Sequence, residues 1–474
     1  MNRCFRATLF FSCLYIKTCF SQSLFSDIKY QLEAGTYFSS SKATPFWQRT
    51  NQYGIVPLQS PIITFRGAAH LEYDSTRNEQ QKLKKFGIGY GLWGVVNIGN
   101  QSKVFLPESY IKIRYRTVEL YGGRRREVIG LVDTTLTSGS YIWSGNALPI
   151  PKIQLSVPNY SQIGKSSFFF KLGISHGWFG NQRGVKNFFL HQKWVYGRLG
   201  REDAKFKFYA GFNHQVQWGG ISENKDPSFS KDGQLAPYPW YSYQFVLIPF
   251  LQKLIKLNPD KLTTFDRGLA IGNHLGSADI GFEFDNKNVK LLFYKQQPYD
   301  FARSLYNFNN IEDGLYGLGI NLKRHYYVKK ILIEYLYTLS QGLYRFGKYQ
   351  TSNYIENDDY FSHGQYTAWE YNHFIIGTPF ILANESGINN NRIKAFSTSI
   401  NGSLFKQTSY ILGGTFSSNL GTYASKLSKK QFSGKANINY PLNNNTSLLG
   451  QVTLDIGTLY SKNIGFSLIY RKLL

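Results

Sequence analysis

From Lys205 to Trp218 the chain reads KFKFYAGFNHQVQW, in which almost every second residue is apolar. One face of this stretch carries the apolar side chains of Phe206, Phe208, Ala210, Phe212, Val216 and Trp218. The other face carries Lys205, Lys207, Tyr209, Asn213, Gln215 and Gln217. Alternation with a period of two indicates a β-strand with one apolar and one wet face. Strands in soluble proteins usually have about 5–6 residues, whereas a tilted membrane-crossing strand needs about 9–11, so this strand is long enough to cross a membrane.

The same long alternation recurs to the last residue and predicts an all-β fold, a transmembrane antiparallel β-barrel. Further predicted strands are 30–40, 85–99, 109–121, 167–179, 187–199, 277–284, 288–295, 314–323, 327–339, 392–405, 408–416, 431–440, 447–456 and 463–472. Because bacterial single-chain barrels have an even number of strands, we expect about 16–18. A water-soluble β-solenoid or sandwich would share the alternation. It would seldom need 17% aromatic residues, because soluble strands are polar outside the core face.

The N-terminus has the features of a secretory signal peptide, predicted to span residues 1–21. Arg3 and Arg6 precede a short apolar run at 7–16, and a small-residue cleavage site follows it. The chain's three cysteines all lie in this segment, at Cys4, Cys13 and Cys19. The barrel, predicted to span 22–474, would therefore be stabilised without disulfides. Acylation of Cys13 or Cys19, as in a lipoprotein, is the alternative, although neither lies in a typical acylation sequence.

One stretch, 238–257, has helical rather than strand periodicity. Its apolar residues Phe250, Leu251, Leu254, Ile255 and Leu257 recur at helical spacing, with Lys253 and Lys256 opposite. Polar residues and Pro249 interrupt its apolar run, which is therefore much shorter than the ~18 consecutive apolar residues that a membrane helix needs. We expect a short amphipathic helix within a long connection between strands. It could serve as a plug, lie on the membrane interface, or simply pack as part of a turn.

The net charge is +25, from 54 Lys and Arg against 29 Asp and Glu. A lumen or mouth of one sign focuses the electric field and attracts polyanions, although a generally basic proteome would give the same total. Nucleic acid is not expected as a partner of an exported membrane protein. The expected partners are therefore acidic polysaccharide, together with the lipid and lipopolysaccharide of the cell outer membrane. We expect a monomer.

The densest positive patch begins on the predicted strand 109–121. Lys112, Arg114 and Arg116 share one face there, and a Lys or Arg facing lipid at mid-membrane costs roughly 2–4 kcal/mol, so this face should look inward. Arg124, Arg125 and Arg126 follow it and extend the patch. Arginine binds carboxylates and phosphates through two parallel hydrogen bonds, as recognition of an acidic polymer requires. The alternatives are an interfacial anchor or a set of internal pairs with Glu119 and Glu127.

A second candidate binding element is the Gly/Ser-rich stretch SGSYIWSGNALP. Tyr141, Trp143 and Asn146 lie in it, and exposed aromatic faces beside amides can grip sugar rings; an ordinary aromatic girdle is the alternative. Pro45, Trp47, Arg49, Asn51 and Gln52 could line the same site or fold a plug. The histidines are scattered, with no HExxH spacing, GxSxG elbow or evident carboxylate pair. We therefore expect no catalysis, no cofactor and no metal.

Two blocks resemble the Wzi family of capsule-assembly proteins. They are PFWQRTNQYGIVP (45–57) and ELYGGRRREVIGLVDTTLTSGSYIWSGNALPIPKIQLSVPNY (119–160), supported by VQWGG (216–220), GNHLGSADIGFEF (272–284) and YFSHGQYTAWEYNHFIIGTPF (360–380). The resemblance implies an outer-membrane barrel of about 18 strands with helical elements at the periplasmic end. It also implies a surface lectin that attaches capsular or other exopolysaccharide to the cell. The alternative function is a porin or channel for sugars or anionic solutes.

Overall fold

The computed structural model describes residues 28–73, 85–182, 184–268, 270–300, 304, 308, 310–342, 358–405 and 407–474. The predicted signal peptide, residues 1–21, lies outside these residues, and so do the chain's three cysteines.

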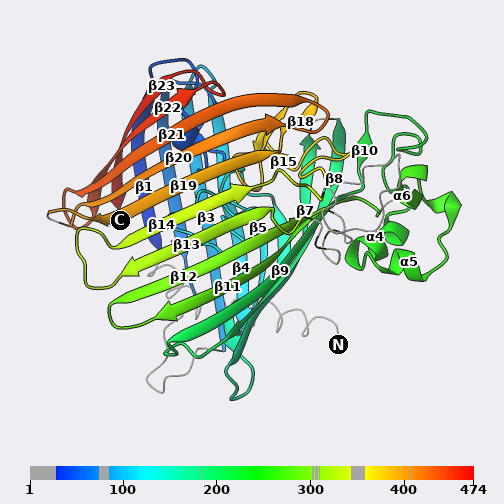
Figure 1. Ribbon diagram of the computed structural model, residues 1–474, viewed down its shortest axis with the longest axis horizontal. Coiled ribbons are helices and arrows are strands. Elements are labelled where there is room, and N and C mark those ends of the chain that lie inside the picture. Colours follow the sequence, from blue (N-terminus) through cyan, green and yellow to red (C-terminus); the bar gives the residue numbers. More distant parts are fainter. Residues whose placement is uncertain are drawn as a thin grey trace, which may run out of the picture.

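The described chain forms a closed antiparallel barrel of 18 strands (Figure 1). The barrel closes where β1 (Lys29–Ser39) pairs with β23 (Asn463–Leu473), so no strand edge remains unpaired in the wall. The strands between are β2 (Ile62–Leu71), β3 (Phe86–Gly99), β4 (Lys103–Tyr115), β5 (Val118–Arg124), β6 (Lys152–Gln162), β7 (Phe168–Gln182), β8 (Val185–Leu199), β9 (Phe206–Trp218), β11 (Asn273–Asp285), β12 (Val289–Tyr299), β13 (Gly314–Leu322), β14 (Lys330–Tyr337), β19 (Ile393–Ser403), β20 (Ser409–Gly421), β21 (Lys426–Pro441) and β22 (Thr446–Gly457). The predicted all-β barrel is confirmed, at the upper end of the expected strand number.

Three strands account for the difference between the predicted and the observed strands. β2 and β6 were not predicted, because the Arg-Gly-Ala-Ala run of β2 and the proline of β6 interrupt their alternation. The predicted strand 109–121 is two strands, because Arg116 adopts a positive φ of 55° in the tight turn between β4 and β5. This turn also reverses the face of Tyr121, which lies opposite Lys112 inside the barrel rather than on the outer face with Ile113.

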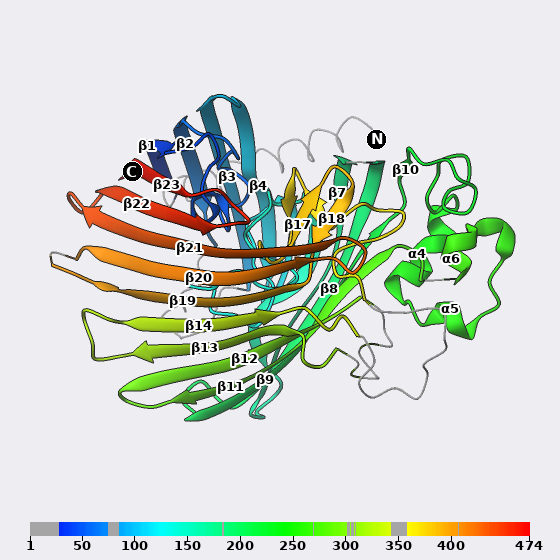
Figure 2. The same ribbon diagram turned by 45° about the horizontal axis from the view of Figure 1, so that its top comes forward.

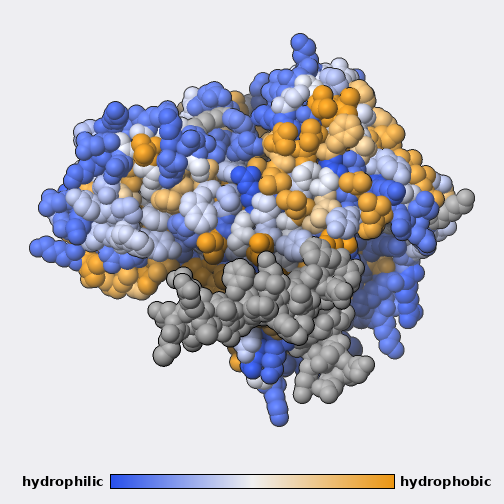
Figure 3. Space-filling view, turned by 180° about the vertical axis from the view of Figure 1, so that it is seen from behind, coloured by the Kyte–Doolittle hydropathy of each residue, from blue (hydrophilic) through white to orange (hydrophobic). Residues whose placement is uncertain are grey.

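The alternating faces of the strands separate lipid from lumen. On β9, Phe206 is 58% exposed on the outside, whereas Lys207 beside it is 3% exposed on the inside. Hydrophobic side chains gather in the same way on the outer wall seen from behind (Figure 3). An apolar outer band around a polar lumen is the property of outer-membrane barrels. The protein is therefore an outer-membrane barrel.

The two ends of the barrel differ in the length of their connections. At the end where both described termini lie, strands are joined mainly by short turns, such as 116–117 and 286–288. At the opposite end the connections 40–61, 125–151, 219–272 and 338–392 are long. Because short turns face the periplasm and long loops face the exterior in such barrels, we assign the long-connection end to the cell surface and call it the outer end.

The helices of the connection 219–272 lie outside the barrel, at the outer end. α4 (Pro239–Leu247), α5 (Leu251–Leu254), a 3₁₀ turn (Pro259–Lys261) and α6 (Thr264–Gly268) lie beside the ends of β7 and β8 and the short strand β10 (Ile221–Ser222) (Figures 1 and 2). The predicted helix at 238–257 is present, but it is divided at Pro249. Its place is at the end assigned to the cell surface, whereas the resemblance implies helical elements at the periplasmic end. Among the described residues, every helix is too short or too polar to span a bilayer.

Candidate functional site

Three of the long connections fold into the lumen and pack together as a plug, formed by residues 40–61, 125–151 and 358–392. The first contains α3 (Phe46–Arg49), and the third contains the hairpin strands β15 (Glu370–Tyr371), β16 (Phe374–Ile375), β17 (Leu382–Asn384) and β18 (Gly387–Asn390). The Tyr141 and Phe361 rings lie 5.5 Å apart at the centre of the plug. Backbone hydrogen bonds join the second and third connections, from Ser144 N to Ile376 O at 3.0 Å and from Thr378 N to Tyr141 O at 3.0 Å.

Buried acceptors on the barrel wall hold the plug in place. Glu334 on β14 accepts hydrogen bonds from Ser138 N at 2.6 Å and from Thr137 Oγ1 at 2.7 Å. Asp279 on β11 accepts one from Leu131 N at 2.9 Å, and Asp455 on β22 accepts one from Phe46 N at 2.9 Å. The plug is thus tied to opposite sides of the lumen through polar groups that water does not reach.

The predicted basic strand face lies where expected for two of its three residues. Lys112 and Arg114 are buried inside the barrel, and Arg116 lies exposed in the turn beyond the end of β4. The Lys112 ammonium forms an ion pair with Glu72, and the Arg114 guanidinium lies 4.2 Å from the centre of the Tyr73 ring. The expectation that all three cations share the lumen wall is wrong, because the alternation ends one residue before Arg116.

Arg124, Arg125 and Arg126 lie where the chain leaves β5 to enter the plug. Arg125 forms ion pairs with Glu119 and Glu127, each at 2.6 Å. Arg126 pairs with Glu108 at 3.0 Å, and Arg124 donates a hydrogen bond to the Tyr371 hydroxyl at 2.8 Å. The internal pairs with Glu119 and Glu127, which the sequence analysis gave as an alternative to a binding patch, are therefore present. Arg124 and Arg126 remain partly accessible within the lumen.

Glu127 is the centre of this charge network. Lys152 approaches it at 2.8 Å from β6, opposite the Arg125 contact. Burial alone would raise the pKa of Glu127, but the Lys152 ammonium and the Arg125 guanidinium outweigh burial and hold the pKa at about 2. The carboxylate is therefore ionised at neutral pH. Because both of its oxygens are already paired with Arg125 and Lys152, it stabilises the fold.

The predicted sugar-binding loop is buried. Tyr141, Trp143 and Asn146 all lie inside the plug, where Asn146 Nδ2 donates to Ile375 O at 2.9 Å. The expectation of exposed aromatic faces there is wrong, because the small residues around them let the loop pack tightly against the third connection. Pro45 and Trp47 likewise belong to the plug, in which Trp47 Nε1 donates to Ser433 O at 3.1 Å.

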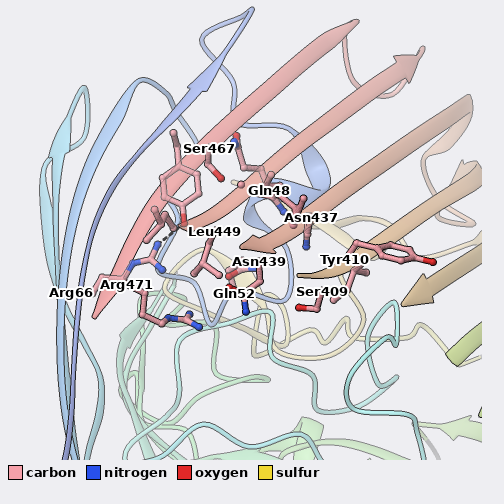
Figure 4. Close-up of a pocket in the computed structure, with 16 residues that line it drawn as sticks. Gln48, Gln52, Arg66, Ser409, Tyr410, Asn437, Asn439, Leu449, Ser467 and Arg471 are labelled. Atoms are coloured by element: carbon pink, nitrogen blue, oxygen red, sulfur yellow. Dashed lines mark hydrogen bonds between the residues drawn. The ribbon is translucent and has the colours of Figure 1, made fainter. Parts of the chain in front are cut away.

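A polar cavity of about 390 Å³ lies in the lumen between α3 and the wall formed by β20 to β23, as Figure 4 shows. Amide side chains of Gln48, Gln52, Asn437 and Asn439 line it. Arg66 and Arg471 stand at its edge and share the carboxylate of Glu33, at 3.2 and 2.7 Å. Asn437 and Asn439 are alternate residues of β21, so strand periodicity could have indicated them, but Gln48 and Gln52 come from α3 and the chain after it, and the cavity depends on where α3 packs.

A sector of the outer end carries six exposed lysines, which the sequence-based hypothesis overlooked. They lie on the connections β1–β2 and β22–β23 and at the starts of β4 and β21, which neighbour one another around the outer end. This rim sector consists of Lys42, Lys103, Lys426, Lys429, Lys430 and Lys462. Their places near Asn-, Ser- and Gly-rich turns were the available signal, but only the barrel brings these separate segments together.

The described residues contain no group of three or more His, Cys, Asp or Glu side chains arranged to hold a metal ion. Of the scattered histidines, His214 and His274 are in contact, with His214 Nε2 3.0 Å from His274 Nδ1. Both lie beneath the helices on the outside of the barrel, away from the plug.

Comparison with solved structures places this architecture among known barrels. Wzi of Escherichia coli, described as a carbohydrate-binding β-barrel involved in group 1 capsule assembly, is similar with a TM-score of 0.57 and 11% identity, covering 96% of this chain and 86% of Wzi. OccK5 (OpdH) of Pseudomonas aeruginosa gives a TM-score of 0.47 at 8% identity, covering 95% of this chain and 99% of that one. OprD of the same organism gives 0.45 at 9% identity, covering 94% of each chain. The fold is that of an outer-membrane β-barrel.

The sequence comparisons add nothing to this result. No family model matches the sequence, and no curated protein matches it. At 11% identity the likeness to Wzi concerns the fold alone.

Proposed function

We propose that this barrel belongs with the Wzi-type proteins and binds acidic capsular polysaccharide or exopolysaccharide, attaching it to the cell surface without catalysis. The observation that carries the proposal is the plug. Three connections fill the outer part of the lumen with buried aromatic residues and are tied to the wall by Glu334, Asp279 and Asp455. A fixed plug suits a protein that holds a polymer outside the barrel better than one that conducts solutes through it. The sequence blocks at 45–57 and 119–160 and the fold likeness to Wzi support the same function.

Deletion of the gene in its native host is the direct test. We expect polymer synthesis to continue while polymer moves from the cells to the medium, because attachment and not synthesis is lost. The measurement is cell-associated against released carbohydrate at equal total yield. A deletion strain complemented with the unmodified gene serves as a control for general envelope damage. Unchanged cell association in the deletion strain would contradict the proposal.

We place the polymer contact at the rim sector rather than in the lumen. The rim lysines are exposed at the outer end, whereas Lys112 is buried and paired with Glu72, and the half-buried Arg125 is paired with Glu119. An exposed ion pair is worth only about 0–1 kcal/mol, so affinity would come from several weak contacts along a repeating polymer. The sequence-based hypothesis, a lumen site that includes Arg124 and Arg126, remains the alternative.

Substitution of four rim lysines separates the two sites. We expect Lys→Gln changes at 426, 429, 430 and 462 together to release most of the polymer and to flatten the salt dependence of binding, because screening acts on exposed charges. The matched control makes the same changes at the other end of the barrel, at Lys29, Lys165, Lys287 and Lys472. A combined Arg124→Gln, Arg126→Gln variant should retain polymer. If that variant releases polymer and the rim variant does not, the binding site lies in the lumen. Arg125 is left unchanged, since its loss would unpair two buried carboxylates.

A further inference from the structure

The α4–α6 insertion covers part of the lipid-facing wall. Val216 and Trp218 belong to the outward, apolar face of β9, yet both are buried. Phe245 and Val246 of α4 cover them, and the Tyr243 ring lies 5.0 Å from the Trp218 ring. In this sector the barrel wall therefore contacts protein where other sectors contact lipid.

The covered strip is unusually polar for an outer wall. Lys193 on β8 and His214 on β9 are paired in register, and both share the outward face with Val195 and Phe208. The Lys193 ammonium donates a hydrogen bond to the carbonyl of Leu247, at the C-terminus of α4, where the helix dipole favours a cation. A lysine facing lipid costs up to about 2–4 kcal/mol, depending on depth. The insertion avoids that cost because it covers the strip and separates Lys193 from the lipid.

The opposite side of the insertion is apolar and exposed. Trp240 is 90% exposed, Leu254 68% and Phe250 62%. Tyr238, Ile248 and Ile255 are exposed as well. Scattered exposed apolar residues are ordinary, but six within one short insertion form a patch that needs a partner. Because Val216 and Trp218, which the insertion covers, lie at the outer end of β9, this patch lies beside the outer edge of the lipid-facing wall, several residues along the strands from Phe208 and Ile280.

The charge next to the patch identifies the partner. Lys253 and Lys256 are exposed beside Leu254, and residues 238–257 contain no Asp or Glu. Tryptophan is enriched at membrane interfaces, and basic amphipathic segments bind anionic lipid surfaces. The insertion lies at the outer end, where it meets the outer leaflet. We propose that it is a membrane anchor, in which Trp240, Phe250 and Leu254 enter the outer leaflet and Lys253 and Lys256 bind the phosphate groups of its lipids.

Accessibility of single-cysteine variants tests insertion into the bilayer. Spin labels at Trp240→Cys and Leu254→Cys would be compared in nanodiscs with a lipid-facing control, Phe208→Cys, and an aqueous control, Tyr327→Cys, which lies in the periplasmic turn 323–329. We expect both insertion labels to resemble Phe208→Cys, with high accessibility to oxygen and low accessibility to a water-soluble nickel complex. If both resemble Tyr327→Cys, the insertion projects into water and the proposal is overturned.

Binding of labelled lipid A to the full-length barrel tests the phosphate contact. Near an anionic surface each lysine contributes ~1 kcal/mol, so Lys253→Gln, Lys256→Gln should weaken binding by about thirtyfold. The matched control, Lys165→Gln, Lys287→Gln, removes the same charge at the periplasmic end and should leave binding unchanged. Dephosphorylated lipid A should bind both variants and the unmodified protein alike. Equal affinity of the two double variants for phosphorylated lipid A would overturn the phosphate assignment, even if the labels are buried.

Discussion

Loosening the plug is expected to turn a barrel that passes little steady current into one with a stable open conductance. The change replaces residues 131–147 by a Gly/Ser stretch of equal length, so that the connection between β5 and β6 can still close. It removes Tyr141 from the plug centre and the hydrogen bonds that Glu334 accepts from Thr137 and Ser138. The wall acceptors would then face water, which satisfies them at little cost. Single-channel recording in planar bilayers measures the outcome.

Single substitutions that weaken the plug less should give a smaller increase in conductance than the replacement of residues 131–147. Glu334→Gln keeps the shape of the side chain but weakens its bond to the buried Ser138 N–H, so we expect brief openings rather than a stable pore. Glu202→Gln is the matched control, because Glu202 lies in the exposed turn between β8 and β9 and pairs only locally with Arg198. Heat-modifiable gel migration would show that each variant has folded. A large steady current through the unmodified protein would instead favour the channel function.

Glu127→Gln is expected to destabilise the barrel by about 3–5 kcal/mol, because it breaks a buried ion pair and leaves its partner uncompensated. Lys152 is 2% exposed and would lose its carboxylate partner at 2.8 Å. Arg125 would keep only Glu119. Equilibrium unfolding in urea with lipid vesicles measures the free energy of unfolding. The Glu127→Leu, Lys152→Met double variant should recover much of the loss, because it removes both charges together.

The same carboxylate gives the stability a predictable dependence on pH. The pKa of Glu127 is held at about 2 in the folded barrel, against an ordinary value of 4.5. Its contribution is therefore complete above pH 4.5 and is lost as the pH falls through this range toward 2. The difference in unfolding free energy between the unmodified protein and Glu127→Gln should shrink accordingly. A difference that stays constant from pH 7 to pH 3 would show that the pairing does not set the pKa.

The candidate site was less predictable than the fold. Hydropathy and lipid cost correctly placed Lys112 and Arg114 inside the barrel, because both follow from the alternation of a single strand. The acidic residues that pair with these cations could not be predicted from the alternation of a single strand. Glu72 and Glu108 come from different parts of the chain, and only strand pairing brings Lys112 and Arg126 to them. The dense run of arginines was therefore interpreted as a binding patch without the acidic partners with which Arg125 and Arg126 pair in the fold.

The sequence by itself determined that this chain is a membrane barrel and which face of most strands meets lipid. The reason is local, since a period of two fixes which side chains share a face, and the cost of a charge in lipid fixes which face looks inward. Only the tertiary structure decided what fills the lumen, where the helices lie and which charges remain exposed. Those depend on contacts such as Ser138 with Glu334, 196 residues apart in the chain, which no local pattern encodes. Trp143 shows the same limit, because whether an aromatic residue in a small-residue loop grips a sugar or packs in a plug depends on what lies across the barrel.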